Sequence, residues 1–242
     1  ATHFIFIDGS EGIDVNEQIT FFINHRTALE NWVAAGGRLL LNGGADLPEN
    51  LGFGSLSNEY YDNNAGNDVR PVTVVGPLLS QPFDLTDQTE YTGSFSHAKV
   101  SGDSLRPLIL GNPRDVVILA DKPYGHGFLV FGGMTVSNFH APQPEGSQIL
   151  VNILHHAANS DITPAAPEAG FIATTPDAVV DNRVTLIDIS SGYSADRTWQ
   201  ISPATFEYAD GSNEHSSKPV IRFRAAGQYS VTLSVKNGQG QD

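Results

Sequence analysis

The chain has 242 residues, 40% hydrophobic and 17% charged, so it is long enough for two folded domains and is not disordered in composition. Its 13 basic and 27 acidic residues give a net charge of −14, which repels phosphate backbones and argues against nucleic-acid binding. It has no cysteine, which excludes thiol catalysis, disulfides and cysteine-ligated zinc, and it has no apolar run of about 18 residues that could insert into a membrane.

The N-terminal part begins with a strand, a helix and a second strand. The apolar run at residues 3–7 is typical of a buried strand, and Asp14 with Glu17 predicts a capping box that starts a helix. Apolar residues recur at helical spacing until the glycine pair at 36–37, where a helix can end. A second buried strand follows at residues 38–41. This order predicts a right-handed βαβ unit with parallel strands.

The rest of this part has a different pattern. Residues 116–120 and 128–131 are two strand-like runs, and the tight turn at 125–127 between them predicts a hairpin. An amphipathic helix is expected at residues 149–157. The stretch from 45 to 115 is rich in glycine, asparagine and aspartate, and we expect long loops with a few strands there.

A linker is expected at residues 161–170, which hold two prolines and no apolar periodicity. Beyond it only strand patterns remain, and the clearest is the alternation of apolar and polar residues from Tyr229 to Val235. Short strands without helices predict a β-sandwich. The expected domains are therefore residues 1–160 and residues 171–242, joined by this linker.

The second part resembles PKD domains over residues 171–242. A tryptophan strand, an Asp-Gly turn and a Gly-x-Tyr-x-Val strand carry the resemblance. They lie in the segments Val184–Gly192, Thr198–Ile201, Asp210-Gly211 and Phe223–Asn237. The family usually has a compact Trp-x-Phe-Gly-Asp-Gly, whereas Ser202 to Ala209 intervene here. The resemblance implies an immunoglobulin-like sandwich that acts as a spacer or adhesive unit of surface and secreted proteins, or as an accessory domain of secreted hydrolases.

The first part resembles the class I glutamine-amidotransferase-like domains of large bacterial surface proteins. The resemblance lies in residues 29–41, 124–133 and 152–155. It implies a Rossmann-like α/β (flavodoxin/amidotransferase-like) domain over residues 1–160. The amidotransferase reaction needs a cysteine thiolate, which this chain lacks, so the domain is expected to have no nucleophile.

Other catalytic and metal-binding patterns are also missing. The chain has no Gly-x-Ser-x-Gly elbow, and His155 and His156 are adjacent, so they cannot form the i, i+4 zinc pair of metalloproteases. The oxygen-rich segment from Asp62 to Asp68 lacks the closing glutamate of an EF-hand, so calcium has only weak support there. We therefore expect no cofactor, no metal and no enzymatic activity.

One polar cluster is a candidate ligand site. In open α/β sheets, ligands collect beyond the carboxyl ends of the strands. Polar residues follow three of the expected strands, and they could line a shallow crevice for a polar ligand such as a glycan. The alternative is that they hydrogen-bond loop backbones, as loop asparagine and aspartate commonly do. These residues are Asp8, Ser10, Asn42, Asp46, Asn138 and His140.

These patterns predict a non-catalytic structural or adhesive module of a large secreted or cell-surface bacterial protein, such as an element of an extracellular filament. The abrupt start and end of the chain suggest a piece of a longer polypeptide. Expected partners are other domains or copies of that protein, and glycans. The alternative is a fragment of a secreted carbohydrate-active or other hydrolase with a PKD accessory domain.

Overall fold

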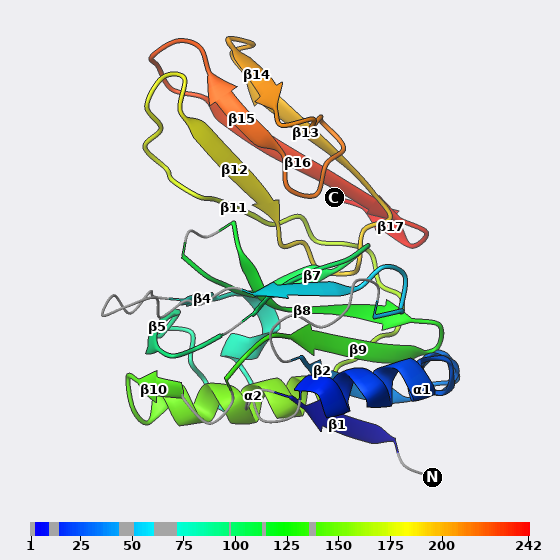
Figure 1. Cartoon of the computed structure of the whole chain (residues 1–242). Helices are drawn as coiled ribbons and strands as arrows, with labels where there is room; N and C mark the ends of the chain where they lie inside the picture. The colour runs from blue at the N-terminus through cyan, green and yellow to red at the C-terminus, as the bar shows by residue number, and fades with distance from the viewer. Residues whose placement is uncertain are drawn as a thin grey trace. The chain divides into compact units, whose positions relative to one another are not determined.

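A computed structural model describes residues 3–9, 15–43, 51–60, 72–96, 98–112, 115–135 and 139–242 (Figure 1). The chain forms two compact units, Ala1–Ile162 and Thr163–Asp242. Each unit is described by itself below.

The first unit contains two α-helices, one short 3-10 helix and ten strands among its described residues. The helices are α1 (Val15–Ala34), η1 (Gly76–Leu79) and α2 (Glu145–Asn159). The strands are β1 (Phe4–Asp8), β2 (Arg38–Asn42), β3 (Ser57–Tyr60), β4 (Val72–Val74), β5 (Glu90–Gly93), β6 (Ala98–Ser101), β7 (Arg106–Leu110), β8 (Val117–Tyr124), β9 (Gly127–Gly132) and β10 (Phe139–Ala141).

Eight of these strands form one sheet in the order β1-β2-β9-β8-β7-β4-β5-β10. Only β1, β2 and β9 run parallel to one another, and all the other neighbours are antiparallel. A separate two-stranded sheet pairs β3 with β6. The predicted parallel pairing of the first two strands and the predicted β8–β9 hairpin are confirmed.

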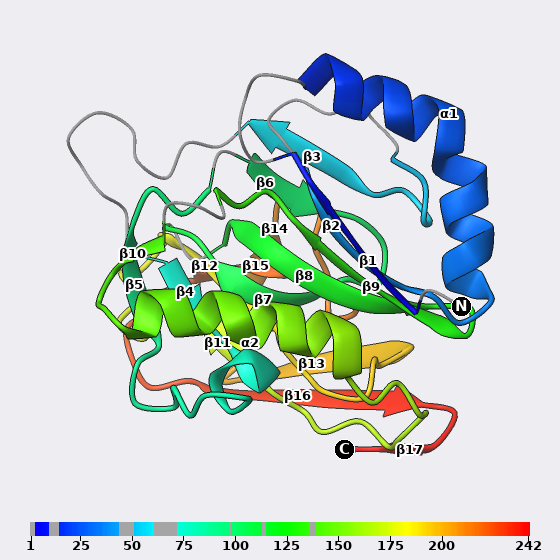
Figure 2. The same ribbon diagram turned by 90° about the horizontal axis from the view of Figure 1, so that it is seen from below.

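The two α-helices pack on opposite faces of the sheet, as Figure 2 shows. Successive strand residues point to opposite faces. On β9, Leu129 and Phe131 join the core cluster that contains Phe22 and Val33 of α1. Phe128, which alternates with them, lies edge-on to His156 of α2, with ring centroids 5.5 Å apart. The central strands are therefore buried on both sides.

The expectation of a Rossmann-like α/β domain was wrong, because the unit is mostly β with only two α-helices among its described residues. A Rossmann-like sheet requires a crossover helix between successive parallel strands. After the single βαβ unit, the described residues between β2 and β8 form no α-helix, and they supply the short strands β3 to β7. Of these strands, β4, β5 and β7 lie in the main sheet, where they pair antiparallel with their neighbours.

The second unit is a β-sandwich, as its PKD resemblance predicts. One sheet has the order β11-β12-β15-β14 and the other has the order β13-β16-β17. The strands are β11 (Phe171–Ala173), β12 (Arg183–Asp188), β13 (Asp196–Ser202), β14 (Phe206–Ala209), β15 (Val220–Phe223), β16 (Ser230–Asn237) and β17 (Gly240–Gln241). Its core contains Val184, Leu186, Trp199, Ile221, Leu233 and Val235.

Two features fix the strands of this sandwich. The buried Trp199 donates from Nε1 to the carbonyl of Ser216, so its polar edge has a hydrogen-bond partner. The Tyr229 hydroxyl donates to the Ala225 carbonyl four residues upstream, at 2.9 Å. This is the tyrosine-corner contact known from immunoglobulin-like sandwiches. Sequence and geometry therefore agree in this unit.

The structure also explains why the Asp-Gly turn is displaced from the tryptophan strand. The intervening residues cross from one sheet to the other and form β14, which pairs with β15. Asp210 and Gly211 then turn the chain with φ angles of 57° and 74°. Both values lie in the left-handed region, which aspartate and glycine tolerate better than most residues.

Candidate functional site

The structure brings two of the predicted crevice residues together. Asn42 ends β2 and is fully buried, and its Nδ2 donates to Asp8 Oδ1 at 2.9 Å and to the Met134 carbonyl at 2.8 Å. Its Oδ1 accepts from the Met134 backbone N–H at 2.8 Å. The Asn42 side chain therefore joins β1, β2 and the segment after β9. A ligand would have to displace these bonds to use it.

The other crevice residues do not join this pair in the described structure. Ser10, Asp46 and Asn138 lie outside the described residues, as does the calcium candidate from Asp62 to Asp68. The backbone of His140 lies in β10, which is at the opposite edge of the sheet from β1. The glycan crevice therefore stays a prediction.

A second polar cluster, which we call the α2 anchor, lies at the end of α2. It consists of Arg38, Arg106, Asp121, His156 and Ser160. Asp121 of β8 is fully buried and accepts two bonds from Arg106 of β7, at 2.9 Å to Oδ1 and 2.6 Å to Oδ2. Its Oδ2 also lies 2.7 Å from Nε2 of His156. One carboxylate therefore joins two strands to α2.

The charges of the α2 anchor favour an ionised Asp121. Burial alone would raise the pKa of this carboxyl group, but the Arg106 guanidinium and the bond from His156 hold it below its ordinary value. Because an ionised carboxylate only accepts hydrogen bonds, Nε2–H of His156 is the donor in its bond to Asp121. The buried carboxylate is therefore paired on both of its oxygens, as a charge inside a protein requires.

Arg38 binds the last turn of α2 from β2. Its Nη2 donates to the Ser160 carbonyl at 2.5 Å, and its Nη1 donates to the Ala157 carbonyl at 3.4 Å. The carbonyls at the end of a helix have no partner within the helix and carry partial negative charge. The Arg38 guanidinium group supplies hydrogen-bond donors to these carbonyls and a positive charge beside them. Its Cζ also lies 5.6 Å from the centre of the Phe128 ring.

Ser160, His156 and Asp121 form a series that resembles the Ser-His-Asp series of serine hydrolases. The Ser160 Oγ lies 2.6 Å from His156 Nδ1, and His156 Nε2 lies 2.7 Å from Asp121. The same Oγ also lies 2.7 Å from the His156 carbonyl. Ser160 sits at the C-terminal end of a helix, where the dipole opposes an oxyanion. These contacts fit a helix cap better than a nucleophile.

The chain is held again just beyond the α2 anchor, inside the second unit. Asn237 Nδ2 donates to the Ala165 carbonyl at 2.7 Å, and the Ala169 N–H donates to Asp242 Oδ2 at 2.6 Å. The Ser191 N–H donates to the Glu168 carbonyl at 3.0 Å. We call these three contacts the linker clasp. They fasten most of the proline-containing segment to the sandwich.

A strained turn in the first unit is held by two charged side chains. Gly52, Phe53, Gly54 and Ser55 all have φ between 50° and 90°, which is unfavourable for Phe53 and Ser55. Glu30 accepts from the Phe53 N–H at 2.6 Å, and Lys122 donates to the Phe53 carbonyl at 2.8 Å. Burial lowers the pKa of Lys122. The fully buried Phe53 ring anchors the turn in the core.

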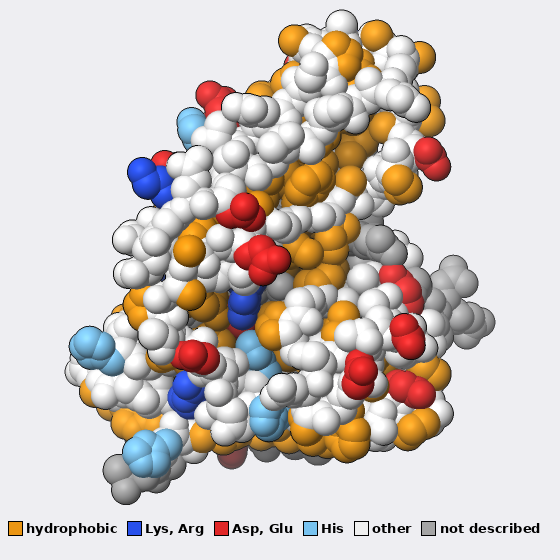
Figure 3. All heavy atoms as spheres, turned by 180° about the vertical axis from the view of Figure 1, so that it is seen from behind, with side chains coloured by type: hydrophobic (Ala, Val, Ile, Leu, Met, Phe, Trp, Pro, Cys, Tyr) orange, Lys and Arg blue, Asp and Glu red, His pale blue; other side chains and the backbone are white. Residues whose placement is uncertain are grey.

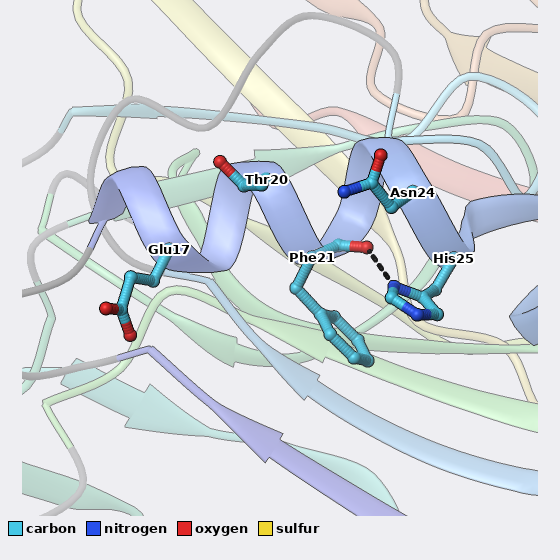
Figure 4. A pocket seen from close by; sticks show the side chains of 5 residues that line it. All are labelled: Glu17, Thr20, Phe21, Asn24 and His25. Atoms are coloured by element: carbon cyan, nitrogen blue, oxygen red, sulfur yellow. Dashed lines mark hydrogen bonds between the residues drawn. The ribbon is translucent and has the colours of Figure 1, made fainter.

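A shallow depression of about 390 Å³ lies beside α1. Figure 4 shows that its lining side chains all project from this helix. They are Glu17, Thr20, Phe21, Asn24 and His25. The His25 ring stacks on Phe21, with centroids 4.5 Å apart. None of the predicted crevice residues lines it.

The described part of the chain contains neither a metal-binding cluster nor a membrane-spanning helix. Within those residues no three histidine or acidic side chains gather in a way that could hold a metal ion. Nor does any described helix combine the length and apolar character needed to cross a membrane. On the face seen in Figure 3, the acidic side chains lie dispersed among neutral and hydrophobic ones. The net negative charge is not concentrated there in a single patch.

Sequence reasoning missed the α2 anchor. Asp121 lies in the continuation of an expected strand, and a charged residue there was the available signal. Its partners Arg106 and His156 are 15 and 35 residues away in sequence. No local spacing rule joins residues so far apart. The sequence pattern around His156 bears only on metal binding, through the adjacent His155.

Comparison with known proteins gives one family match. Residues 164–242 match the model of the PKD domain. The second unit is therefore a PKD domain, and its sandwich agrees with this match. No curated protein matches the chain, and the amidotransferase-like resemblance of the first unit is not confirmed.

Solved structures with some similarity include three glycosidases. The exo-beta-1,4-mannosidase Op5Man5 from Opitutaceae bacterium strain TAV5 aligns at 16% identity and a TM-score of 0.39, over 66% of this chain and 26% of that enzyme. A beta-galactosidase from Rahnella sp. R3 aligns at 13% identity and a TM-score of 0.37, over 96% of this chain and 31% of that enzyme. A beta-galactosidase from Bacillus circulans sp. alkalophilus aligns at 11% identity and a TM-score of 0.37, over 98% of this chain and 32% of that enzyme. The chain spans less than a third of each enzyme.

Proposed function

We propose that this chain is a non-catalytic structural or adhesive module of a large secreted or cell-surface bacterial protein. PKD domains typically occur in extracellular proteins, and the match over residues 164–242 supports that setting. The proposed partners are other domains or copies of the same surface protein, with glycans as a further class. An extracellular filament is the assembly that such a module would suit.

The observation that supports a structural role most is the way in which the connection between the units is held. The α2 anchor fixes the chain at Ser160, and the linker clasp fixes it again at Ala165. Only residues 161–164 lie between these two points, so the five extended residue steps from Ser160 to Ala165 span no more than about 18 Å. A connection this short suits domains that must stay in series in a long surface protein.

The two fastenings would also share a mechanical load. Tension along the backbone would first reach Arg38 with its helix-end carbonyls in one unit, and Asn237 with Ala165 in the other. Both contacts join segments that are more than 70 residues apart in sequence. Pulling on the connection would therefore act on the sheets themselves and not on a loose tail.

The native parent protein is the direct test of this function. Antibodies raised against this chain would be used to label intact cells and secreted material, to isolate the parent chain for mass measurement, and to locate it by electron microscopy. We expect surface labelling and a parent chain several times larger than 25.9 kDa. A parent no larger than this chain, found only inside cells, would contradict the proposal.

A hydrolase is the second candidate, and the Ser160–His156–Asp121 series is the observation that favours it. The chain would be incubated with a fluorophosphonate probe, and with aryl esters, β-galactosides and β-mannosides. We expect no labelling and no turnover above the Ser160→Ala variant. Turnover that disappears in Ser160→Ala but persists in Ser147→Ala, which alters an exposed serine hydroxyl on the same helix, would favour the hydrolase.

A further inference from the structure

Strand β1 forms one edge of the eight-stranded sheet and pairs only with β2 among the described residues. The His3 carbonyl accepts from Arg38 and the Gly9 N–H donates to Asn42, so residues 3 and 9 direct their backbone groups toward β2. Backbone direction alternates along a strand, which makes Ile5 and Ile7 face β2 as well. The N–H and C=O groups of Phe4 and Phe6 therefore point away from the sheet.

Edge strands are usually protected from pairing with another strand by shortness, proline, lysine or a bulge. The opposite edge of the same sheet follows this rule: β10 has three residues, shows a register irregularity and is followed by Pro142. In contrast, β1 keeps a regular register over all five of its residues and contains no proline and no lysine. Among the described residues, the β10 edge is protected in these ways and the β1 edge is not.

The side chains of β1 suit pairing with a strand of the same kind. Its residues Phe4 to Ile7 are apolar, and Phe6 remains 37% exposed. On a molecule with a net charge of −14, two copies repel each other over most of their surfaces. A neutral apolar strand is where two such copies can approach closely. Cross-strand aromatic pairs then add to the backbone hydrogen bonds.

We propose that two copies of this chain associate through β1, antiparallel about a two-fold axis at Ile5, to form one continuous sheet. Phe4 of one copy lies opposite Phe6 of the other, and each such pair exchanges two backbone N–H···O bonds. In this register the Asp8 carboxylates lie at opposite ends of the paired segment, so they do not repel. The inference rests on the geometry of β1 and holds whether or not the chain is a surface module.

The first test is the mass of the full chain in solution, measured by analytical ultracentrifugation over a range of concentrations. We expect a concentration-dependent dimer. Phe6→Lys should weaken dimerisation by at least about tenfold, because it places two ammonium groups in the paired segment. Val179→Lys is the matched control, since Val179 is 64% exposed in the other unit, and it should leave the dimer unchanged. A chain that stays monomeric up to its solubility limit would overturn the proposal.

A second test does not depend on Phe6→Lys folding well. The chain has no cysteine, so single cysteines can be introduced without background reaction. Ile5 lies opposite its own counterpart at the axis, close enough for a disulfide, and mild oxidation of Ile5→Cys should give a covalent dimer. Val151→Cys, on the exposed side of α2, should cross-link far more slowly. Equal rates for the two variants would show that the copies do not meet at β1.

Discussion

Asp121 is a buried charge whose value to the fold depends on its partners. A carboxylate without solvent exposure is costly unless its oxygens find donors, and Arg106 and His156 supply three bonds to them. Replacing the whole group with apolar residues need not destabilise a protein, but removing one member leaves the others unpaired. The α2 anchor should therefore respond strongly to single substitutions.

We expect Asp121→Asn to lower the free energy of unfolding of the first unit by about 3–5 kcal/mol. The substitution keeps the size of the side chain but leaves the buried end of Arg106 without its counter-charge. Urea denaturation followed by circular dichroism measures the change. Asp87→Asn, which alters an exposed carboxylate of the same unit, serves as the control and should change stability by less than about 0.5 kcal/mol.

The pH dependence of the stability difference between wild type and Asp121→Asn follows from the sign of the Asp121 pKa shift. The Asp121 pKa is lower in the folded state than its ordinary value of 3.8, so the folded state binds this proton less readily than the unfolded state does. Its contribution to stability is full above the ordinary pKa and is lost as the pH falls through the folded pKa. The stability difference between wild type and Asp121→Asn should therefore shrink in acid. A difference that does not change with pH would contradict the assignment.

Tyr91 presents the opposite situation. Its side chain is fully buried, its hydroxyl has no hydrogen-bond partner in the described part of the chain, and burial, with a smaller effect of Glu145, raises its pKa to about 12. We expect Tyr91→Phe to raise the free energy of unfolding by about 1 kcal/mol, because it removes an unsatisfied polar group without changing the packed ring. Thermal unfolding of the two proteins would measure this. A destabilised phenylalanine variant would show that the hydroxyl has a partner.

At the scale of elements, the β8–β9 turn is fitted against the end of α1. A Cβ atom added to Gly127 would lie 2.0 Å from the Val33 carbonyl oxygen and 2.3 Å from that of Gly37. The His126 N–H donates to the Ala34 carbonyl at 2.9 Å, so the turn also caps the helix. The hairpin and the helix therefore hold each other in place.

This close fit predicts that Gly127→Ala destabilises the first unit by about 2–3 kcal/mol, because backbone atoms must move to admit the methyl group. Gly238→Ala is the control, since no atom outside its immediate neighbours lies within 4 Å of the added Cβ. Chemical denaturation compares the two variants. If both were equally stable, the turn would not be packed as described.

Several elements were predictable because their signals are local. The apolar runs that became β1 and β2, the hairpin turn and the alternation in β16 all follow from spacing within a few residues. The short strands β3 to β7 were not predictable in the same way. Their pairing depends on partners such as β4 with β7, which are more than 30 residues apart, and their sequences hold few alternating residues. The Rossmann-like expectation failed at this point.

The candidate sites also divide into one with a local sequence signal and one without. Asn42 was singled out because polar residues after a buried strand are a local signal, and the structure gives it three side-chain hydrogen bonds. The α2 anchor draws its members from β2, β7, β8 and the end of α2. Only the order of strands in the sheet brings them together, and that order was not available from spacing or composition.

At the scale of the whole molecule, the chain consists of two units with separate cores. The family match begins at residue 164, close to the division at 162/163. The proline-containing segment, expected to be a linker, carries the linker clasp and so contributes contacts to the sandwich. This assigns a stabilising role to residues that composition alone marks as a spacer.

We expect residues 163–242 to fold alone with one cooperative thermal transition, and residues 171–242 to be less stable by about 1–2 kcal/mol, a shift of roughly 5–10 °C. The shorter fragment lacks the carbonyls of Ala165 and Glu168 and the N–H of Ala169, so the linker clasp cannot form. Differential scanning calorimetry measures both fragments. Equal melting temperatures would mean that the clasp contributes nothing to the sandwich.

The two tryptophans of the chain are divided between the units, which provides a built-in optical reporter for each. Trp32 packs beside Gly37 in the first unit, and Trp199 is buried in the core of the second. Emission from an indole shifts to longer wavelength when water reaches it, so a Trp32→Phe protein reports on the sandwich alone. The order in which the two units unfold under heat, denaturant or force can then be followed without any attached dye.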